Sequence, residues 1–212
     1  MIYSFPSKAR PIRQGDIFAN IPRASVSLDS LATVTDENIQ VISWGAIADE
    51  NRKIEAILPV TSVFAIVATQ NCDALSSPEI TLCEIRQFSE VDGKVKDTKK
   101  PNAWEKIITQ HARINQKWFY LPPDPKIGFT EKMAVDFRCT IRVPRMELEN
   151  FRNFRKGTLN ALAQQHFRER LGQFFRRYPY NEWYSLDSEE LKAYEKNHKC
   201  EVSPKYTWQN GK

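Results

Sequence analysis

The hydrophobic period of this chain changes at Pro144, and that change limits the fold more than any other feature of the sequence. Before Pro144, apolar residues form short runs or alternate with polar residues, and charged, Gly or Pro residues separate these segments. After Pro144, apolar residues recur three and four positions apart, which is the helical period. Short strands without helical crossovers, followed by helices, predict an α+β fold in which a small antiparallel β-barrel carries C-terminal helices.

Two of the expected strands have distinct patterns. Residues 63–69 form a continuous apolar run, which is typical of a central strand buried on both faces. Residues 133–143 alternate, so Val135, Phe137, Cys139, Ile141 and Val143 share a buried face, and the outer face carries Asp136, Arg138, Thr140 and Arg142. The other expected strands are 14–21, 39–47, 54–60, 80–88 and 118–121.

The helical segments set the predicted domains. The barrel is expected to span 1–145, with a helical insertion near 101–112, and a helical extension is expected over 146–196. In that extension, a short helix ends near Gly157, a long helix runs over 158–178, and a last helix begins with the capping pair Asp187 and Glu190. Residues 197–212 form a polar tail.

The positive charge of the chain is concentrated in one segment. The net charge is +5, and residues 138–179 carry ten Lys or Arg, nine of them Arg, against three acids. Arginine suits bidentate contacts with phosphate or carboxylate groups. The segment therefore indicates a nucleic-acid surface, a docking surface for an acidic protein, or a solvated helix face.

Several classes of protein do not fit the sequence. No apolar run approaches the roughly 20 residues of a membrane helix, and the N-terminus lacks the apolar core of a secretory signal. The four cysteines form no C-x-x-C pair, and no histidine stands at ligand spacing from one of them. We expect a cytoplasmic protein with reduced, mostly buried thiols, with no membrane contact and with neither a metal nor a cofactor.

The apolar run at 63–69 ends in the polar group Gln70-Asn71-Cys72-Asp73. One interpretation makes Cys72 a nucleophile with His111 as its base, or His166 as a poorer second because it lies within the apolar periodicity, although Asp73 beside Cys72 would disfavour a thiolate. A second makes the group a polar binding pocket. The third is a strand end at which Asn and Asp side chains bind turn amides. The sequence leaves all three open.

Arg138 and Arg142 stand two residues either side of Thr140 on the charged face of one expected strand. With Arg86 they could form a row of phosphate contacts. Cross-strand pairing with acids such as Glu84 is the alternative.

Three segments resemble the PemK/MazF-like barrel of bacterial toxin–antitoxin systems. Residues 13–18 (RQGDIF) resemble the opening strand of that family, 63–71 its central strand, and 134–148 its "R-T-[IV]" strand and the helix after it. The resemblance spans roughly residues 12–154 and implies that Ile17, Val63 and Ile66 fill the barrel. A glycine before Asp16 permits a tight entry into the first strand, where Asp16 can accept backbone N–H groups.

The resemblance also implies a function. It suggests an RNA-binding or RNA-cleaving protein of a bacterial toxin–antitoxin or antiphage system, and cleavage would be the metal-independent reaction of an endoribonuclease. Arg86, Arg138 and Arg142 would contact phosphate, and Asp73 or His111 would assist proton transfer. Ribonucleases of the family carry an arginine before the central strand, whereas residues 58–62 here read LPVTS.

The missing arginine motivates an alternative function. The barrel would then be a non-catalytic scaffold that binds a partner protein through its basic C-terminal helices, and apolar helix surface left exposed would favour a homodimer. The chain also resembles uncharacterised bacterial proteins with "GDI", "SQ-x-CD" and "R-x-x-L-x-x-x-F-F-x-R" motifs, the last matching residues 168–177. That second resemblance implies no known chemistry.

Overall fold

A computed structural model describes residues 2–35, 38–50, 53–91, 117–175 and 196 of the chain. The chain divides into two compact units, Met1–Phe174 and Phe175–Lys212. The predicted helices at 101–112 and from residue 187, and the predicted tail at 197–212, lie outside the described residues.

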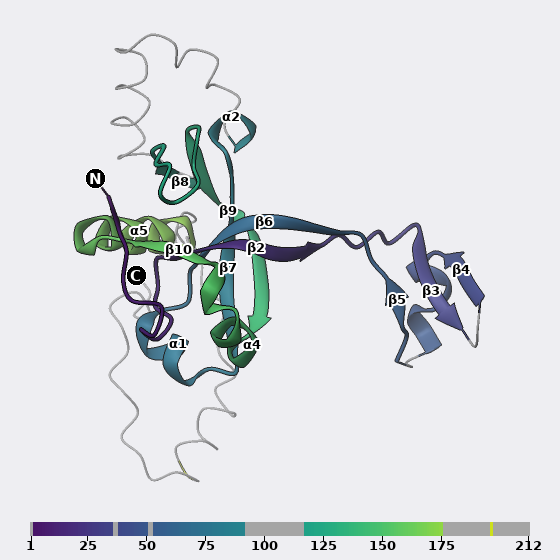
Figure 1. Ribbon diagram of the computed structural model, residues 1–212. Helices are drawn as coiled ribbons and strands as arrows, with labels where there is room; N and C mark the ends of the chain where they lie inside the picture. The colour runs from purple at the N-terminus through teal and green to yellow at the C-terminus, as the bar shows by residue number, and fades with distance from the viewer. Residues whose placement is uncertain (1, 36–37, 51–52, 92–116, 176–195, 197–212) are drawn as a thin grey trace, which may run out of the picture. The chain divides into compact units, whose positions relative to one another are not determined.

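Seven strands form the main sheet, in the spatial order β1-β10-β2-β6-β7-β9-β8, and every neighbouring pair in the described chain is antiparallel (Figure 1). The central position of β6, between β2 and β7, agrees with the prediction from its continuous apolar run. The bounds of the strands are β1 Tyr3–Ser4, β2 Asp16–Ala24, β6 Val60–Val67, β7 Glu79–Gln87, β8 Trp118–Leu121, β9 Met133–Pro144 and β10 Arg155–Leu159.

A second, smaller sheet is inserted in the sequence between β2 and β6. It contains β3 (Leu31–Thr35), β4 (Asn38–Ile42) and β5 (Ala56–Ile57) in the order β4-β3-β5. Two 3₁₀ turns, η1 (Trp44–Ala46) and η2 (Ala48–Glu50), follow β4. The expected strand at 39–47 therefore stops at residue 42, and β3 was not predicted.

The main sheet has an apolar core on each face. Along β6, Ala65 and Val67 point to one core and Ile66 to the other, as the two-residue period of a strand requires. The α5-side core includes Ile17, Ile66, Ile85, Leu121, Val135, Phe137, Phe167 and Phe174. The α4-side core includes Ile12, Phe18, Ala65, Val67, Ala74, Ile80, Leu82 and Leu148.

The main sheet curls around the α5-side core. All seven of its strands contribute a residue to that core or to the packing against it, and the Tyr3 hydroxyl of β1 donates a hydrogen bond to the Pro122 carbonyl just after β8 (2.7 Å). Tyr3 and Phe129 also pack edge to face. Among the described residues no backbone pairing joins β1 to β8, so the antiparallel sheet is not a closed barrel. The described fold is α+β.

The helices of the described chain are α1 (Asn71–Ser76), α2 (Phe88–Val91), α4 (Arg145–Asn150), the 3₁₀ turn η4 (Arg152–Phe154) and α5 (Ala161–Phe175). The long helix expected over 158–178 begins later, at Ala161, and Asn160 caps it: its Oδ1 accepts a hydrogen bond from the Ala163 N–H (2.9 Å). Ala163, Phe167 and Phe174 form the buried side of α5, whereas Leu162 is exposed.

The predicted boundary at residue 145 is wrong, because the segment after it returns to the sheet. β10 lies between β1 and β2 in the main sheet, within the stretch that the sequence assigned to helices. Its five residues, RKGTL, have no apolar alternation, and Arg155 in it is buried by an ion pair. A strand that is held by an ion pair needs no alternating apolar residues, so the sequence pattern does not predict it.

Candidate functional site

A long bulge in β9 brings a buried carboxylate, Asp136, together with Arg138. Neighbouring residues Cys83 and Glu84 of β7 pair with Thr140 and Asp136, so 137–139 bulge out of β9. Three extra residues are an odd number, and an odd insertion exchanges the two faces of a strand. Val135 and Phe137 accordingly pack in the α5-side core, whereas Ile141 and Val143 pack against the α4-side core.

The carboxylate of Asp136 holds the bulge in place. Its Oδ1 accepts hydrogen bonds from the backbone N–H (3.0 Å) and Nε (2.8 Å) of Arg138, and its Oδ2 accepts one from Nη2 (2.7 Å). The result is a bidentate guanidinium–carboxylate pair closed over two residues of backbone. Arg86 of β7 approaches the same carboxylate, with its Nη1 4.0 Å from Oδ2.

A second arginine–carboxylate ion pair lies beside the first. Glu84, directly opposite Asp136 in the sheet, accepts hydrogen bonds from Nη1 of Arg23 at both carboxylate oxygens (3.0 and 2.8 Å). The Nε of Arg86 is 4.0 Å from Glu84, and its Nη2 is 3.2 Å from Glu90. We call Arg23, Glu84, Arg86, Asp136 and Arg138 the arginine network.

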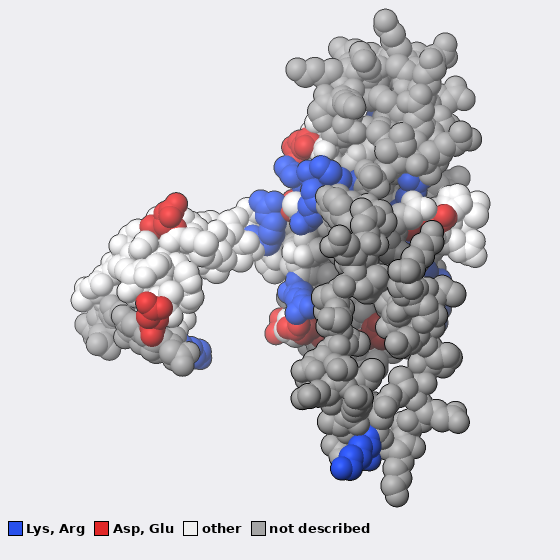
Figure 2. All heavy atoms as spheres, turned by 180° about the vertical axis from the view of Figure 1, so that it is seen from behind, with Lys and Arg blue, Asp and Glu red and all other residues white. Residues whose placement is uncertain are grey.

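The network presents positive charge outward and keeps negative charge inside. The side chains of Arg23, Arg86 and Arg138 are 36%, 33% and 42% exposed, whereas those of Glu84 and Asp136 are 5% and 1% exposed. Figure 2 shows a group of Lys and Arg side chains above the centre of its view, with Asp and Glu side chains exposed beside it. A ligand approaching the network therefore meets guanidinium groups first.

The ionisation of the network follows from these contacts. Burial would raise the pKa of Asp136, but the hydrogen bonds and charge of Arg138, with the charge of Arg86, outweigh it, so the pKa lies below its ordinary value. The pKa of Arg138 is raised by its hydrogen bonds to Asp136. Cys139 has a raised thiol pKa, first because of burial and then because of Asp136 and Glu84. Cys139 is thus kept as a thiol and is a poor nucleophile.

An aromatic cluster lies on the same face as the network. Trp118 pairs with Asp136, and Tyr120 pairs with Ala134, which itself pairs with Arg86. Residues that pair directly across antiparallel strands share a face. Trp118 and Tyr120 also pack edge to face on Phe88, with ring centroids 4.6 and 5.7 Å apart. Arginines and aromatic rings therefore adjoin each other at the β7–β9–β8 end of the sheet.

Two of the three predicted phosphate-binding arginines come together, and the third does not. Arg86 and Arg138 both belong to the network, but Arg142 lies beyond the bulge, opposite Thr81, and pairs with Glu79 (3.5 Å). Thr81 is five residues from Arg86 along β7, which is about 17 Å. The bulge also places Arg142 on the opposite face from the network. The expected row of Arg86, Arg138 and Arg142 is therefore split.

The polar group after the central strand begins a helix. Gln70 is the N-cap residue of α1, and Asn71 Oδ1 accepts a hydrogen bond from the Gln14 N–H (3.0 Å). Cys72 is exposed, and its Sγ is 3.6 Å from the Asp73 carboxylate. These contacts favour the strand-end interpretation. His111, the predicted base, lies outside the described residues.

The described part of the basic segment, residues 138–175, does not form one surface. Arg155 is buried against Asp16, and its other donors bind the carbonyls of Ser7 and Lys8. Arg168 donates to the Gln14 side chain (3.0 Å). Arg145 and Arg152 donate to backbone carbonyls of the chain. Most of the described arginines of this segment thus have structural partners, and Arg138 is the member that joins the network.

Asp16 has the structural role that the sequence indicated. Its fully buried Oδ2 accepts the Arg13 N–H (3.1 Å), as expected of an Asx residue at a strand entry, and also binds Arg155 (3.0 Å). Arg10 binds the other oxygen. Gly15 before it has φ +87°, which a residue with a Cβ rarely adopts. This site is filled by protein groups and fixes the N-terminal loop.

Sequence reasoning missed Arg23 and underestimated the two acids of the network. Glu84 was expected only as a cross-strand partner of an arginine. Asp136 was expected only as a residue on the outer face of its strand. A usable signal was present: single acids stand in the apolar strand segments ITLCEIRQF and MAVDFRCTI, and a buried carboxylate needs a charged partner. Arg23 follows Pro22 and carries no comparable signal.

Comparisons with known proteins do not identify a relative. A scan against protein-family models, a search of curated proteins and a search of solved structures each returned no match. In the described part of the chain, no group of three or more His, Cys, Asp and Glu side chains could hold a metal ion. No described helix is long and apolar enough to cross a bilayer.

Proposed function

We propose that this protein binds single-stranded RNA, and that the arginine network contacts its phosphates. The observation that carries the proposal is the convergence of Arg23, Arg86 and Arg138 around two buried carboxylates, with the guanidinium groups outward. A guanidinium has five N–H donors, and a bidentate ion pair uses only two of them. The remaining donors suit the oxygens of a phosphodiester.

The buried carboxylates prepare the arginines for binding. An exposed arginine loses side-chain entropy when a ligand fixes it, and this loss weakens binding. The Arg138 side chain is already held by two hydrogen bonds to Asp136, and the Arg23 side chain by two to Glu84. A phosphate that binds at this face therefore fixes few additional rotatable side-chain bonds, and the entropy loss on binding is small.

The proposal is binding and not cleavage. Cys72 and Asp73 belong to α1, which lies just before the first residue of β7. Arg86 lies near the opposite end of β7. Glu79 and Arg86 are seven residues apart on that strand, about 23 Å. Proton transfer at a phosphate needs a group within hydrogen-bond reach, about 3 Å. Asp73 and Cys72 are thus badly placed to act on a phosphate bound by the network.

The scaffold that we propose for this function is a PemK/MazF-like barrel in a bacterial toxin–antitoxin or antiphage setting. The curl of the main sheet around the α5-side core and the Tyr3–Pro122 hydrogen bond between its outer strands support that likeness. So do the positions of Ile17 and Ile66 in this core, although Val63 packs against the other core. Measuring bacterial growth after induced expression tests whether the protein is toxic, as a toxin–antitoxin setting would require.

Arg86→Gln is the most informative variant, because Arg86 makes the loosest ion pairs of the network. Its removal should weaken the binding of a single-stranded RNA oligomer about fivefold to tenfold and reduce the slope of log affinity against log salt by about 0.7. Fluorescence anisotropy at several salt concentrations measures both. The same reaction, run with and without chelator and resolved on a gel, reports whether the RNA is cut.

Arg142→Gln is the matched control, since it removes the same charge from an arginine outside the network. It should change affinity less than about twofold, because one distant charge is largely screened at physiological salt. Equal losses in the two variants would mean that RNA responds to net charge alone, and the proposed site would be wrong. Undetectable binding by the unmodified protein at low salt would reject RNA binding altogether.

A further inference from the structure

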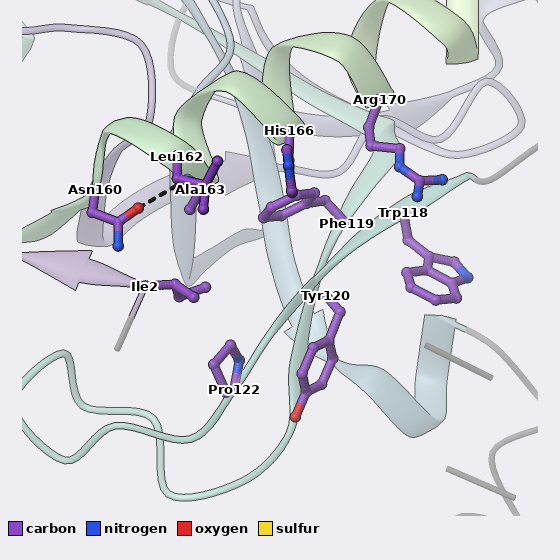
Figure 3. Close-up of a pocket in the computed structure, with 10 residues that line it drawn as sticks. All are labelled: Ile2, Trp118, Phe119, Tyr120, Pro122, Asn160, Leu162, Ala163, His166 and Arg170. Atoms are coloured by element: carbon purple, nitrogen blue, oxygen red, sulfur yellow. Dashed lines mark hydrogen bonds between the residues drawn. The ribbon is translucent and has the colours of Figure 1, made fainter. Parts of the chain in front are cut away.

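A cavity of about 490 Å³ lies at the outer edge of β8, between that strand and α5 (Figure 3). Its volume is within the range of about 300–1,000 Å³ that small-molecule sites occupy. Trp118, Phe119 and Tyr120 line it from β8, and His166 and Arg170 line it from α5. Ile2, Pro122, Asn160, Leu162 and Ala163 complete the lining.

The lining combines aromatic surface with a few polar groups. Figure 3 shows the Arg170 guanidinium pointing toward the Trp118 indole, and the His166 ring next to Phe119. His166 is exposed, so its ring nitrogens can reach a ligand in the cavity. Asn160 Oδ1 is already used by the N-terminus of α5. This chemistry fits a flat, aromatic, hydrogen-bonding ring better than an aliphatic chain.

The position of the cavity ties it to the arginine network. Trp118 is paired with Asp136, so the aromatic wall begins one strand away from the carboxylate that binds Arg138. Neighbouring strands are about 4.8 Å apart. Arg86 is two strands from β8, about 10 Å, and the network faces away from α5, so an RNA strand that contacts both sites passes around the β8 edge of the sheet.

We propose that this cavity binds a nucleobase of a single-stranded RNA whose backbone phosphates contact Arg86 and Arg138. The proposal rests on the RNA binding proposed above and adds the group that the protein recognises. Grooves that combine basic residues with aromatic rings hold single strands by stacking and by phosphate contacts together. The base stacks against the rings from β8, and His166 binds its edge.

The test compares two oligomers with the same phosphates. One is a uridine octamer with all its bases, and the other is an octamer of the same length whose sugars carry no bases. The full-length protein should bind the base-bearing strand at least about fivefold more tightly, because each stacked base contributes measurably to affinity. Fluorescence anisotropy with labelled strands gives both dissociation constants under one salt condition.

Two variants should remove this preference. Tyr120→Leu takes away a ring and keeps most of the apolar volume, and His166→Ala changes an exposed side chain that the fold does not need. Both should lower the affinity for the base-bearing strand toward that of the baseless strand, which should itself be unchanged. Gln165→Ala is the control, since Gln165 is exposed on the same helix and does not line the cavity.

The outcomes separate this inference from the function on which it rests. Equal binding of the two strands by the unmodified protein overturns the base site and leaves phosphate binding standing. A preference that survives in both variants also overturns it, because the base is then held elsewhere. If neither strand binds, the proposed function fails and the base site fails with it.

Discussion

The two sheets of this protein bury their faces differently. The main sheet has an apolar core on each side, and it also buries charged groups, including Asp16, Glu84 and Asp136. The small sheet buries Leu31 and Thr33 on one face. On its other face, Val34, Ile39, Val41 and Ile57 are exposed beside the half-buried Ala32, and the pairing register places the five side by side.

The difference shows what each sheet is able to support. A sheet packed on both faces fixes its side chains, so it can hold buried carboxylates in one geometry and aim their arginine partners at a ligand. A sheet with one solvated face gains less free energy per residue and has no such second layer. The arginine network is therefore found where strands are buried on both sides.

The largest expected effect is the loss of an aromatic ring from the core of the main sheet. Phe167 is fully buried and packs against Phe119 and Phe137, with ring centroids 5.4 and 5.9 Å away. Phe167→Ala should lower the free energy of unfolding by about 3–5 kcal/mol, measured by urea denaturation. Leu162→Ala on the same helix is the control, and its exposed side chain should cost less than about 1 kcal/mol. Similar losses would show that α5 does not pack as described.

Asp136→Asn should have the next largest effect. The amide keeps the shape of the side chain but loses the charge that binds Arg138, and hydrogen bonds to charged groups contribute about 1.5–3 kcal/mol each. Because Arg138 keeps partial contact with water, the expected net loss is about 2 kcal/mol. Glu79→Gln, which breaks the exposed pair with Arg142, is the control and should cost at most about 0.5 kcal/mol.

The pH dependence of the free energy of unfolding should show the contribution of the Asp136 carboxylate. The folded-state pKa of Asp136 is lowered, so its contribution to stability is complete above the unfolded pKa near 3.8 and is lost as pH falls through the lower folded value. The stability gap between the unmodified protein and Asp136→Asn should therefore be widest near pH 6 and should narrow as pH drops below about 4. Urea unfolding at pH 6, 4 and 3 measures this gap. A gap that stays constant would mean that Asp136 acts through its shape alone.

Much of the main sheet could be predicted from the sequence, because its strands bury apolar side chains at a regular spacing. β8 was predicted to the residue, and β6, β7 and β9 within three residues. β3 and β10 were missed for a physical reason. β3 packs one face only and is short, and β10 is positioned by the Arg155–Asp16 pair, which joins residues distant in the sequence.

The site was predicted only in part, because its geometry depends on the bulge. The apolar residues of β9 alternate without interruption, so the sequence placed Arg138 and Arg142 in one row. The bulge at 137–139 exchanges the faces while leaving the alternation intact, since Phe137 and Ile141 enter opposite cores. No local pattern signals such an exchange, because it is set by the pairing with β7 and by the Asp136–Arg138 contact.

The comparison that contains the smallest expected effect, at Val41, separates the two sheets most directly. Val→Thr nearly conserves side-chain shape and replaces one methyl group with a hydroxyl, so its cost measures how completely a position is removed from water. At Val67, which is fully buried in the main sheet, it should cost about 1–3 kcal/mol. At Val41, which is 69% exposed on the small sheet, it should change the free energy of unfolding by less than about 0.5 kcal/mol. A loss at Val41 as large as that at Val67 would show that the apolar face of the small sheet is covered in solution, and the contrast between the two sheets would then be wrong.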